Sequence, residues 1–494
     1  MTIGLASLPN RFSEFEVMGS SLDYPEEKFF STYKALSVGE LYHVLLESGQ
    51  SGRYSIAGLR PFAVFSAKNH CLRIDTEEGY TQKEGNPLDE MKKWMKPFEL
   101  NTDPNLPDFQ GGLVGYISYD YIRYIEELPQ KAADDLKTQD LYFLAFQQVV
   151  VYDHHYKKLW IILHHDKQKR EEAQREWYYV KETWEHPPAF HWKQRPFRED
   201  GSTPPSFSRE GFAEAVGHVQ EYIRTGDAFQ VNLSVRQAKP VKTPPLHIYE
   251  KLREFNPSPY MGYFHTPDFQ LVSGSPELLI KKRDDEASTR PIAGTRPRGD
   301  TDQEDNGYEK EMMETEKERA EHVMLVDLER NDLGKVCSYG SVEVDELMVV
   351  ERYSHVMHIV SNVKGKLADN VDVYDMIKAA FPGGTITGAP KIRTMEIIEE
   401  LEPVRRGVYT GSLGWIGFNK DMELNISIRT MVISDEMAYV QAGAGIVIDS
   451  NPEAEYEESL KKAKALWKAK EMSEEEMTRS KSRAEEVFVH DFYD

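Results

Sequence analysis

Carboxylates stand at spacings that suit a hard metal ion in two segments of the chain. In the first, residues 310–333, the pattern predicts a helix, and at 100° per residue Glu318 and Glu321 share a stripe with Leu325 and Leu328. Mg2+ prefers oxygen ligands and usually keeps waters or substrate oxygens in its shell, so two acids three residues apart could converge on it. The alternative is that the acids occupy the solvated end of this face and only the leucines are buried.

A second acidic cluster opens another predicted helix near the C-terminal end. Its members are Glu453, Glu455, Glu457 and Glu458. Asn451 suits the N-cap and Pro452 the first turn, where acidic residues also complement the helix dipole. Helix stabilisation therefore explains most of these acids, and only one or two need hold a metal.

Two glycine-rich stretches could bring backbone amides close to a small anion. FPGGTITGAPK, residues 381–391, has the glycine spacing of a nucleotide phosphate loop, but Ala389 and Pro390 stand where such a loop needs Lys and Ser or Thr. Thr385 and its glycine neighbours could instead contact a small anionic ligand. In QAGAGIV, Gly445 could do the same, or could mark a strand bulge that has no ligand.

An arginine and a histidine in strand-like runs are further candidates. Arg429 follows NISI; a strand arginine usually faces solvent, but one that faces a pocket could hold a carboxylate with two hydrogen bonds. His358, in SHVMHIVSNV, is either structural or a general acid. The chain has no HExxH pattern, no GxSxG and no Rossmann fingerprint, which excludes the common zinc, hydrolase and dehydrogenase sites.

The composition indicates a globular protein whose partners are small molecules or other proteins. The 494 residues carry 60 basic and 83 acidic side chains, a net charge of −23, which disfavours nucleic acid or an anionic membrane surface as partner. An anionic substrate therefore needs a locally positive pocket. Only two cysteines, Cys71 and Cys337, no signal-peptide pattern and no apolar run of about 18 residues predict a cytoplasmic protein.

The elements that must position these residues fall into two parts. Residues 1–185 alternate short strand-like runs, such as LYFLAFQQVVVYDH, with turns, and indicate a β-rich part. Residues 186–207 are rich in proline and charge and predict a linker. Residues 208–470 mix helices with strands, beginning with a helix over 208–226, and 471–494 form a charged tail.

In their order along the chain, these motifs resemble the chorismate-utilising enzymes. The motifs are RPIAGTRPRG, ERAEHVMLVDLERNDLG, YSHVMHIVSNV, FPGGTITGAPKIRTMEIIEELEP, RRGVYTGSLGWIGF, ISIRT and AGAGIVIDSNPEAEYEES, and the similarity runs from about residue 41 to about Leu466. The resemblance implies one large α+β (α/β) domain of two packed antiparallel β-sheets surrounded by helices, like that of anthranilate synthase. It also implies a Mg2+-dependent reaction on chorismate.

The resemblance assigns roles to individual residues. Those expected to hold the metal are Glu321 and Glu458, with Glu318 and Glu455 close by. Those expected to hold the enolpyruvyl carboxylate are Tyr409, Arg429 and the backbone at Gly445. Those expected around the ring carboxylate and the departing C4 hydroxyl are Gly294, Thr385 and the catalytic candidates His358, Thr295 and Glu277.

Two branches of the family fit the chain. One adds ammonia at C4 of chorismate, giving 4-amino-4-deoxychorismate for 4-aminobenzoate and folate; the other adds it at C2 and eliminates pyruvate, giving anthranilate for tryptophan. FQVNLS, Gly384 and YTGSLGW favour the first branch. Ala293 favours the second, because many C4-aminating members carry a lysine there that attacks C2 covalently, although a subgroup of them also has PIAGT. We predict amination at C4, with C2 amination as the alternative.

Both branches need a nitrogen donor. The chain also has segments that resemble a tryptophan site. Either free ammonia or a glutamine amidotransferase subunit supplies the nitrogen, because no glutaminase context surrounds Cys71 or Cys337. LLES and NPSPYM resemble the tryptophan site of anthranilate synthases, here structural or regulatory; its residues are Leu46, Glu47, Ser48, Asn256, Pro257, Ser258, Pro259, Tyr260 and Met261. A remote alternative is a binding protein that keeps the fold without catalysis.

Overall fold

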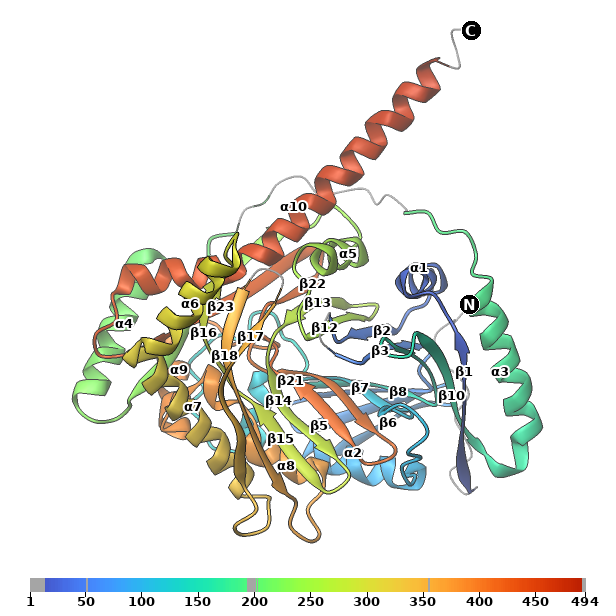
Figure 1. Cartoon of the computed structure of the whole chain (residues 1–494), viewed down its shortest axis with the longest axis horizontal. Coiled ribbons are helices and arrows are strands. Elements are labelled where there is room, and N and C mark those ends of the chain that lie inside the picture. Colours follow the sequence, from blue (N-terminus) through green and yellow to red (C-terminus); the bar gives the residue numbers. More distant parts are fainter. Residues whose placement is uncertain (1–13, 50–51, 193–200, 202, 354–355, 491–494) are drawn as a thin grey trace.

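Two large antiparallel β-sheets form the body of the protein, in a computed structural model that describes residues 14–49, 52–192, 201, 203–353 and 356–490 (Figure 1). Sheet A has 11 strands, in the order β1 (Phe15–Asp23), β10 (Lys158–Asp166), β9 (Gln148–Asp153), β3 (Tyr54–Leu59), β2 (His43–Glu47), β12 (Tyr260–His265), β13 (Phe269–Ser275), β22 (Thr430–Ser434), β23 (Met437–Ile446), β11 (Gln230–Pro240) and β19 (Gly388–Ala389).

Sheet B has 12 strands, and its first strands carry predicted site residues. The order is β16 (Ile292–Pro297), β18 (Val356–Lys366), β15 (Glu286–Arg290), β14 (Leu278–Arg283), β21 (Met422–Asn425), β20 (Ser412–Gly417), β7 (Gly112–Ile117), β8 (Leu141–Phe146), β4 (Ala63–Lys68), β5 (Cys71–Thr76) and β6 (Gly79–Glu84), and β17 (Glu343–Arg352) pairs with β18.

Helices cover the outer faces of both sheets (Figure 1). They are α1 (Glu26–Leu36), α2 (Pro87–Met95), α3 (Arg170–Glu185), α4 (Arg209–Arg224), α5 (Pro245–Phe255), α6 (Asp302–Glu314), α7 (Glu316–Gly334), α8 (Val373–Ala380), α9 (Lys391–Leu401) and α10 (Pro452–His490), with 3-10 turns η1 (Lys96–Phe98), η2 (Tyr119–Tyr124), η3 (Lys167–Lys169) and η4 (Gly384–Ile386). Within the described residues, no helix is long and apolar enough to cross a membrane.

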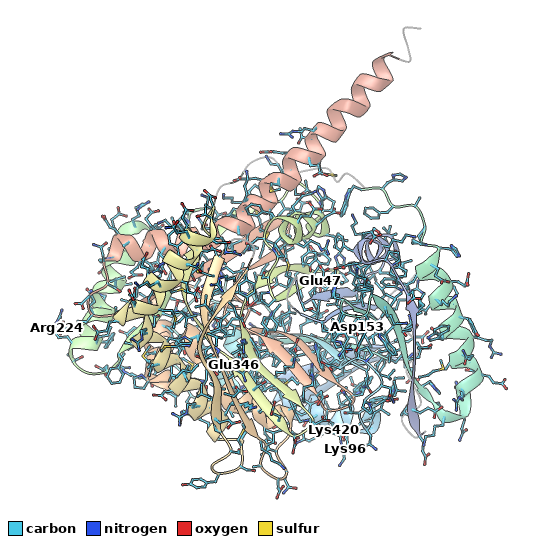
Figure 2. The ribbon with its side chains drawn as sticks, viewed as in Figure 1. Glu47, Lys96, Asp153, Arg224, Glu346 and Lys420 are labelled. Carbon is cyan, nitrogen blue, oxygen red and sulfur yellow. The ribbon has the colours of Figure 1, made fainter. Side chains whose placement is uncertain are left out.

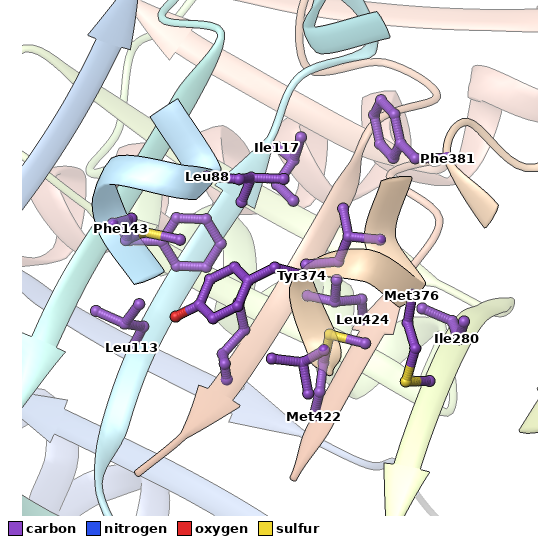
Figure 3. Close-up of a cluster of buried hydrophobic side chains, with 14 of the residues drawn as sticks. Leu88, Leu113, Ile117, Phe143, Ile280, Tyr374, Met376, Phe381, Met422 and Leu424 are labelled. Carbon is purple, nitrogen blue, oxygen red and sulfur yellow. The ribbon is translucent and has the colours of Figure 1, made fainter. Parts of the chain in front are cut away.

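Strand β8 shows how the two sheets share a core. All six residues of LYFLAF are buried, and successive side chains of a strand point to opposite faces. Tyr142 and Leu144 pack between the sheets, whereas Phe143 packs on the outer face with α2 and α8. Figure 3 shows that outer cluster, in which Phe143 and Leu88 lie with Tyr374 of α8. The structure confirms the predicted pair of packed antiparallel sheets surrounded by helices.

Both sheets contain strands from the early and the late parts of the chain. In sheet A, Leu45 of β2 pairs with Tyr263 of β12, and in sheet B, Val114 of β7 pairs with Trp415 of β20. The predicted parts 1–185 and 208–470 are therefore joined across hydrogen-bonded strands. The linker predicted at 186–207 lies partly outside the described residues, and the boundary drawn at residue 470 falls inside α10, which runs on to His490.

Two predicted helices can be compared with the structure. The helix expected over 208–226 is α4, where the Ser208 side chain accepts from Gly211 N and Gly226 follows the helix end at φ 86°. The single helix expected over 310–333 is wrong, because α6 ends before Thr315 and α7 begins after it. Thr315 is extended (ψ 108°), and its hydroxyl donates to Glu311 O, so this β-branched residue ends one helix and starts the next.

A buried ion pair fixes three segments near the ends of α9 and β11. The side chains of Glu402 and Arg406 are 2% and 1% exposed, and Arg406 Nη2 lies 2.7 Å from Glu402 Oε1. Glu402 Oε1 also accepts from Ser234 N of β11 at 3.0 Å. Arg406 donates to Asn232 O at 2.7 Å and to Ile386 O, in η4, at 2.9 Å. One guanidinium therefore joins α9, β11 and the glycine-rich turn.

We expect Glu402→Gln to lower the free energy of unfolding by about 3 to 5 kcal/mol, because Arg406 then stays charged and buried without a counter-charge. Urea unfolding followed by circular dichroism measures this. Glu400→Gln, on the exposed side of α9, is the matched control and should change stability by less than about 1 kcal/mol. Equal midpoints for the two variants would contradict the importance of the pair.

Candidate active site

A bulge at Gly294 brings Gly294, Thr295 and His358 together. The β16 to β18 register shifts between Ala293 and Thr295, and Gly294 has φ 58°, where a side chain is strained and a Cβ would also lie 3.3 Å from Met312. His358 Nδ1 lies 3.0 Å from Thr295 Oγ1 and 3.2 Å from Gly294 O. Because a carbonyl only accepts, Nδ1 carries the proton. Burial lowers the pKa of His358, so its ring is neutral near pH 7.

The Glu277 carboxyl is buried at the start of β14. Its Oε1 has no hydrogen-bond partner within the described part of the chain. Burial raises the pKa of Glu277 to about 7, against smaller opposing contributions from Thr385, the Ile292 backbone and Lys462. A carboxylic acid that titrates near neutral pH can both give and take a proton, as acid and base catalysis requires.

Unpaired polar atoms gather around the η4 turn. Thr385 Oγ1 and Asn232 Oδ1 are buried and lack partners among the described residues, as does Glu277 Oε1. Asn232 Nδ2 lies 3.4 Å from the backbone carbonyl oxygen of Thr385, so the Asn232 side chain contacts the η4 turn. Because buried polar groups are nearly always hydrogen-bonded, these three atoms mark a candidate site for a polar ligand, where the Thr385 hydroxyl is also close enough to lower the pKa of Glu277.

Arg429 and Tyr409 lie close to each other and offer the candidate site a positive charge and a hydroxyl group. Burial lowers the pKa of the Arg429 guanidinium, and Tyr409 and Glu458 are close enough to oppose that shift. Arg429 Nη1 donates to Lys462 O at 2.6 Å, which fixes the arginine against α10. Burial raises the pKa of Tyr409 to about 12, so its hydroxyl keeps its proton. The field of Arg429 also reaches His358.

Gly445 links this region to the predicted metal ligands. A Cβ at Gly445 would lie 2.3 Å from Gln230 Nε2, so the glycine lets the Gln230 side chain lie across β23. Gln230 Nε2 lies 3.4 Å from Glu321 Oε1. On the neighbouring stretch of β23, Lys462 Nζ donates to Gly443 O at 3.0 Å and pairs with Glu458 Oε1 at 2.7 Å.

The four acids predicted to hold a metal offer only oxygen donors. Glu318 Oε1 pairs with Arg296 at 2.7 Å, its Oε2 is buried with no partner among the described residues, and Glu455 Oε1 accepts from Ser450 at 2.8 Å. In the described part of the chain, no three His, Cys, Asp or Glu side chains form a group that could hold a metal. The donors fit Mg2+, which takes one or two protein carboxylates and completes its shell with water and substrate oxygens.

Six of the nine residues expected at a tryptophan site line one cavity of about 520 Å3 between the sheets. They are Leu46, Glu47, Ser48, Pro259, Tyr260 and Met261. Asn256, Pro257 and Ser258 do not line it; Ser258 instead donates to Gly274 O at 2.8 Å. Figure 2 places Glu47 inside the body, far from Arg224 at the end of α4, and Arg253 and Tyr249 of α5 bind its carboxylate.

The cavity and the catalytic residues share a wall. Pro276 and Leu278 line the cavity, and Glu277 stands between them. Ile292 also lines the cavity and precedes Ala293 in β16, where side chains alternate between the two faces of the strand. The two sites are therefore separated by one layer of backbone.

The structure thus places Gly294, Thr295 and His358 at the bulge of β16 and β18, and Thr385 at the η4 turn beside β11. It also adds three that sequence reasoning missed as site residues: Gln230, Asn232 and Lys462. Both Gln230 and Asn232 lie in the motif FQVNLS, and alternation along β11 puts them on one face of the strand, which is a usable signal. Lys462 stands one turn after Glu458 and carried no signal among the many lysines of that helix.

Comparisons with known proteins agree with this geometry. Residues 42–468 match the family described as chorismate binding enzyme. The chain is 51% identical over 460 residues to aminodeoxychorismate synthase component 1 of Bacillus subtilis (strain 168), covering 93% of this chain and 98% of that protein. It is 44% identical over 431 residues to anthranilate synthase component 1 of Thermus thermophilus, covering 87% and 91%.

The solved structure of anthranilate synthase component I from Streptococcus pneumoniae TIGR4 superposes with a TM-score of 0.74 at 34% identity, covering 84% of this chain and 92% of that one. This similarity confirms the predicted anthranilate-synthase-like fold. The match over residues 42–468 takes in every predicted site residue. The chain therefore belongs to the chorismate binding enzyme family.

Proposed function

We propose that this chain catalyses the amination of chorismate to 4-amino-4-deoxychorismate, for 4-aminobenzoate and folate biosynthesis. The observation that carries the proposal is the 51% identity, over 93% of the chain, to aminodeoxychorismate synthase component 1, against 44% to anthranilate synthase component 1 of Thermus thermophilus. The site supports it, because buried unpaired polar atoms, one buried arginine and a carboxyl that titrates near pH 7 suit a small dianion that must lose a hydroxyl group.

The residues divide between the two carboxylates of chorismate. Arg429 and the Tyr409 hydroxyl, with the backbone at Gly445, hold the enolpyruvyl carboxylate. Thr385 Oγ1 and the bulged backbone at Gly294 face the ring carboxylate. An arginine in a partly dehydrated site binds a carboxylate with two parallel hydrogen bonds, which fixes the orientation of the substrate as well as its position.

Glu277 supplies the proton that the departing C4 hydroxyl takes up, and the proton that ammonia loses when the C–N bond forms restores the balance. Chorismate and ammonia give the amino product and water, so the departing C4 hydroxyl must take up a proton. With a pKa of about 7, Glu277 is partly protonated at neutral pH and has an unpaired Oε1 facing the site. Neutral His358, held by Gly294 O and Thr295, keeps that side of the site free of a second positive charge.

Mg2+ is proposed as the cofactor, with Glu321 and Glu458 as ligands and Glu318 and Glu455 near them. When bound, the ion would supply a Lewis acid for chorismate oxygens and hold the dianion in place. The residues of the chain contribute oxygen donors only, and Glu318 Oε2 is buried and unpaired among the described residues.

The position at which many C4-aminating members carry a lysine nucleophile is occupied here by Ala293, in β16. Ala293 is buried and small, so it leaves room for water or ammonia to act at C2 in place of the lysine side chain. Nitrogen comes from free ammonia or from a glutamine amidotransferase subunit. Burial raises the pKa of the Cys337 thiol to about 11, which argues against a glutaminase nucleophile at that residue. The cytoplasmic location stays a prediction.

The cavity between the sheets is proposed to bind tryptophan. Aromatic walls from Tyr54, Phe109 and Trp415 stand beside charged groups of both signs, among them Arg283 and Glu423. An aromatic amino acid needs this combination, because its ring prefers apolar contacts while its ammonium and carboxylate need opposite charges.

The product identifies the branch. We expect purified protein with chorismate, Mg2+ and ammonium to form a compound that an added lyase converts to 4-aminobenzoate, measured by chromatography. Fluorescent anthranilate with pyruvate release would instead establish C2 amination. No consumption of chorismate at high ammonium would establish a binding protein without catalysis.

Removing either proposed ligand tests the metal. Glu321→Gln and Glu458→Gln should each lower kcat/KM by more than about 100-fold, because each replaces a charged oxygen ligand with a neutral one. Steady-state kinetics over a range of Mg2+ concentrations measures the effect. Glu453 is exposed in the first turn of α10, the helix that carries Glu458. Glu453→Gln is therefore the matched control, and its kcat/KM should stay near the wild-type value. A kcat/KM that does not depend on the Mg2+ concentration would contradict the assignment of Glu321 and Glu458 as metal ligands.

Calorimetry tests the second site. One equivalent of L-tryptophan should bind per protein chain. Leu46→Trp, which fills part of the cavity, should abolish the heat of binding. Val38→Trp places the same side chain on an exposed residue and should bind as wild type does. If the wild-type protein gives no heat of binding at millimolar tryptophan, the cavity does not bind tryptophan.

A further inference from the structure

One tyrosine contacts both the cavity between the sheets and the candidate active site. Tyr353 is among the residues that line the cavity. Its ring centre also lies 5.7 Å from the ring centre of His358, and the two ring planes make an angle of 59°. Tilted rings at this separation attract each other, so this contact helps to hold the imidazole in place.

The backbone of Tyr353, directly after β17, is held on both sides. Tyr353 N donates to Val356 O, at the start of β18, at 2.8 Å. Tyr353 O accepts from Arg298 Nη1 at 2.7 Å. Arg298 is held in turn by Asp305 of α6, whose Oδ2 accepts from Arg298 Nε at 2.8 Å. Both backbone polar groups of Tyr353 are therefore bonded, and its ring extends from a fixed position.

The hydroxyl group of Tyr353 binds a carboxylate that lies opposite His358. Tyr353 donates to Glu351 Oε2, and Glu351 Oε1 accepts from Arg290 Nε at 3.0 Å. In the register of β17 and β18, Glu351 pairs with His358. Tyr353 and Arg290 thus share the carboxylate that faces the imidazole across the strand pair.

The orientation and the charge of His358 depend on different neighbours. Its Nδ1 lies 3.2 Å from Gly294 O and 3.0 Å from Thr295 Oγ1, so these bonds hold one atom of the ring, and Nε2 carries the lone pair. The direction of that lone pair depends on the plane of the ring. Burial lowers the pKa of His358 most; the Gly294 carbonyl raises it, Arg429 lowers it and Glu351 raises it.

We propose that Tyr353 is a positioning residue for His358. Its ring sets the plane of the imidazole, and its hydroxyl holds the Glu351 carboxylate. This inference rests on the proposed function, because it assumes that His358 acts on chorismate. The two contributions can be separated, since phenylalanine keeps the ring without the hydroxyl and leucine keeps only apolar bulk.

Two variants give different expected results. Tyr353→Leu should lower kcat for chorismate amination about 10-fold, because the imidazole loses its ring contact, while KM stays within about 2-fold. Tyr353→Phe should keep kcat within about 2-fold of wild type. In Tyr353→Phe, however, the pKa of His358 should rise by about 0.5, because Glu351 loses a hydrogen bond and its charge acts more strongly on the ring.

The pKa is measured by NMR of protein labelled with 13C at histidine Cε1, and His358→Gln identifies the resonance. Tyr339 is fully exposed in the turn before β17. Tyr339→Leu and Tyr339→Phe are therefore the matched controls and should change neither kcat nor the pKa of His358.

Three results would overturn the proposal. They are a wild-type kcat in Tyr353→Leu, a fall in kcat accompanied by an equal rise in KM, and an unchanged pKa of His358 in Tyr353→Phe. The pKa is measured without substrate, so it can be read even if the wild-type protein fails to aminate chorismate. That failure would refute the proposed function and not the contact between Tyr353 and His358.

Discussion

The arrangement of the site depends on one buried charge pair, Glu402 with Arg406. A guanidinium taken out of water must satisfy its N–H groups within the protein, and Arg406 does so on carbonyls of β11 and η4 as well as on Glu402. Those contacts fix the strand that carries Gln230 and Asn232 and the turn that carries Thr385. Arg406 also lies 5.6 Å from the ring centre of Tyr409. Arg406 therefore holds in place the two segments that carry the unpaired polar atoms of Asn232 and Thr385.

A second constraint is the sharing of strands between the two ends of the chain. Because β2 and β3 from the early part lie next to β12 from the later part, the cavity between the sheets can form only when both parts have folded. The cavity is lined by Pro276, Leu278 and Ile292. Glu277 lies between the first two in the chain and belongs to the candidate active site. The cavity is thus lined by the two immediate chain neighbours of Glu277.

The sequence predicted the fold class for identifiable reasons, and the site residues stay predictions. Helix α4 followed from its cap and its apolar period, and the β-rich character of residues 141–154 from strand-forming runs. The break at Thr315 was missed, because apolar and acidic periodicity continues across it. Asn232 and Lys462 were missed as site residues, because one arises from a contact between β11 and η4 and the other from a contact between α10 and β23, which no local pattern records. Arrangement in space, not residue type, distinguished Lys462 from its neighbours.

Helix α10 carries Glu458 and Lys462 near one end and is tied to α5 farther along. Ser473 bonds to Thr243 and His247, at the start of α5, and α5 in turn carries the Arg253 and Tyr249 side chains that bind Glu47 in the cavity wall. The 15 residues from Glu458 to Ser473 span about 22 Å of unbroken helix at 1.5 Å per residue. Because no glycine or proline interrupts α10 between Glu458 and Ser473, this helix connects the position of Glu458 mechanically to that of α5.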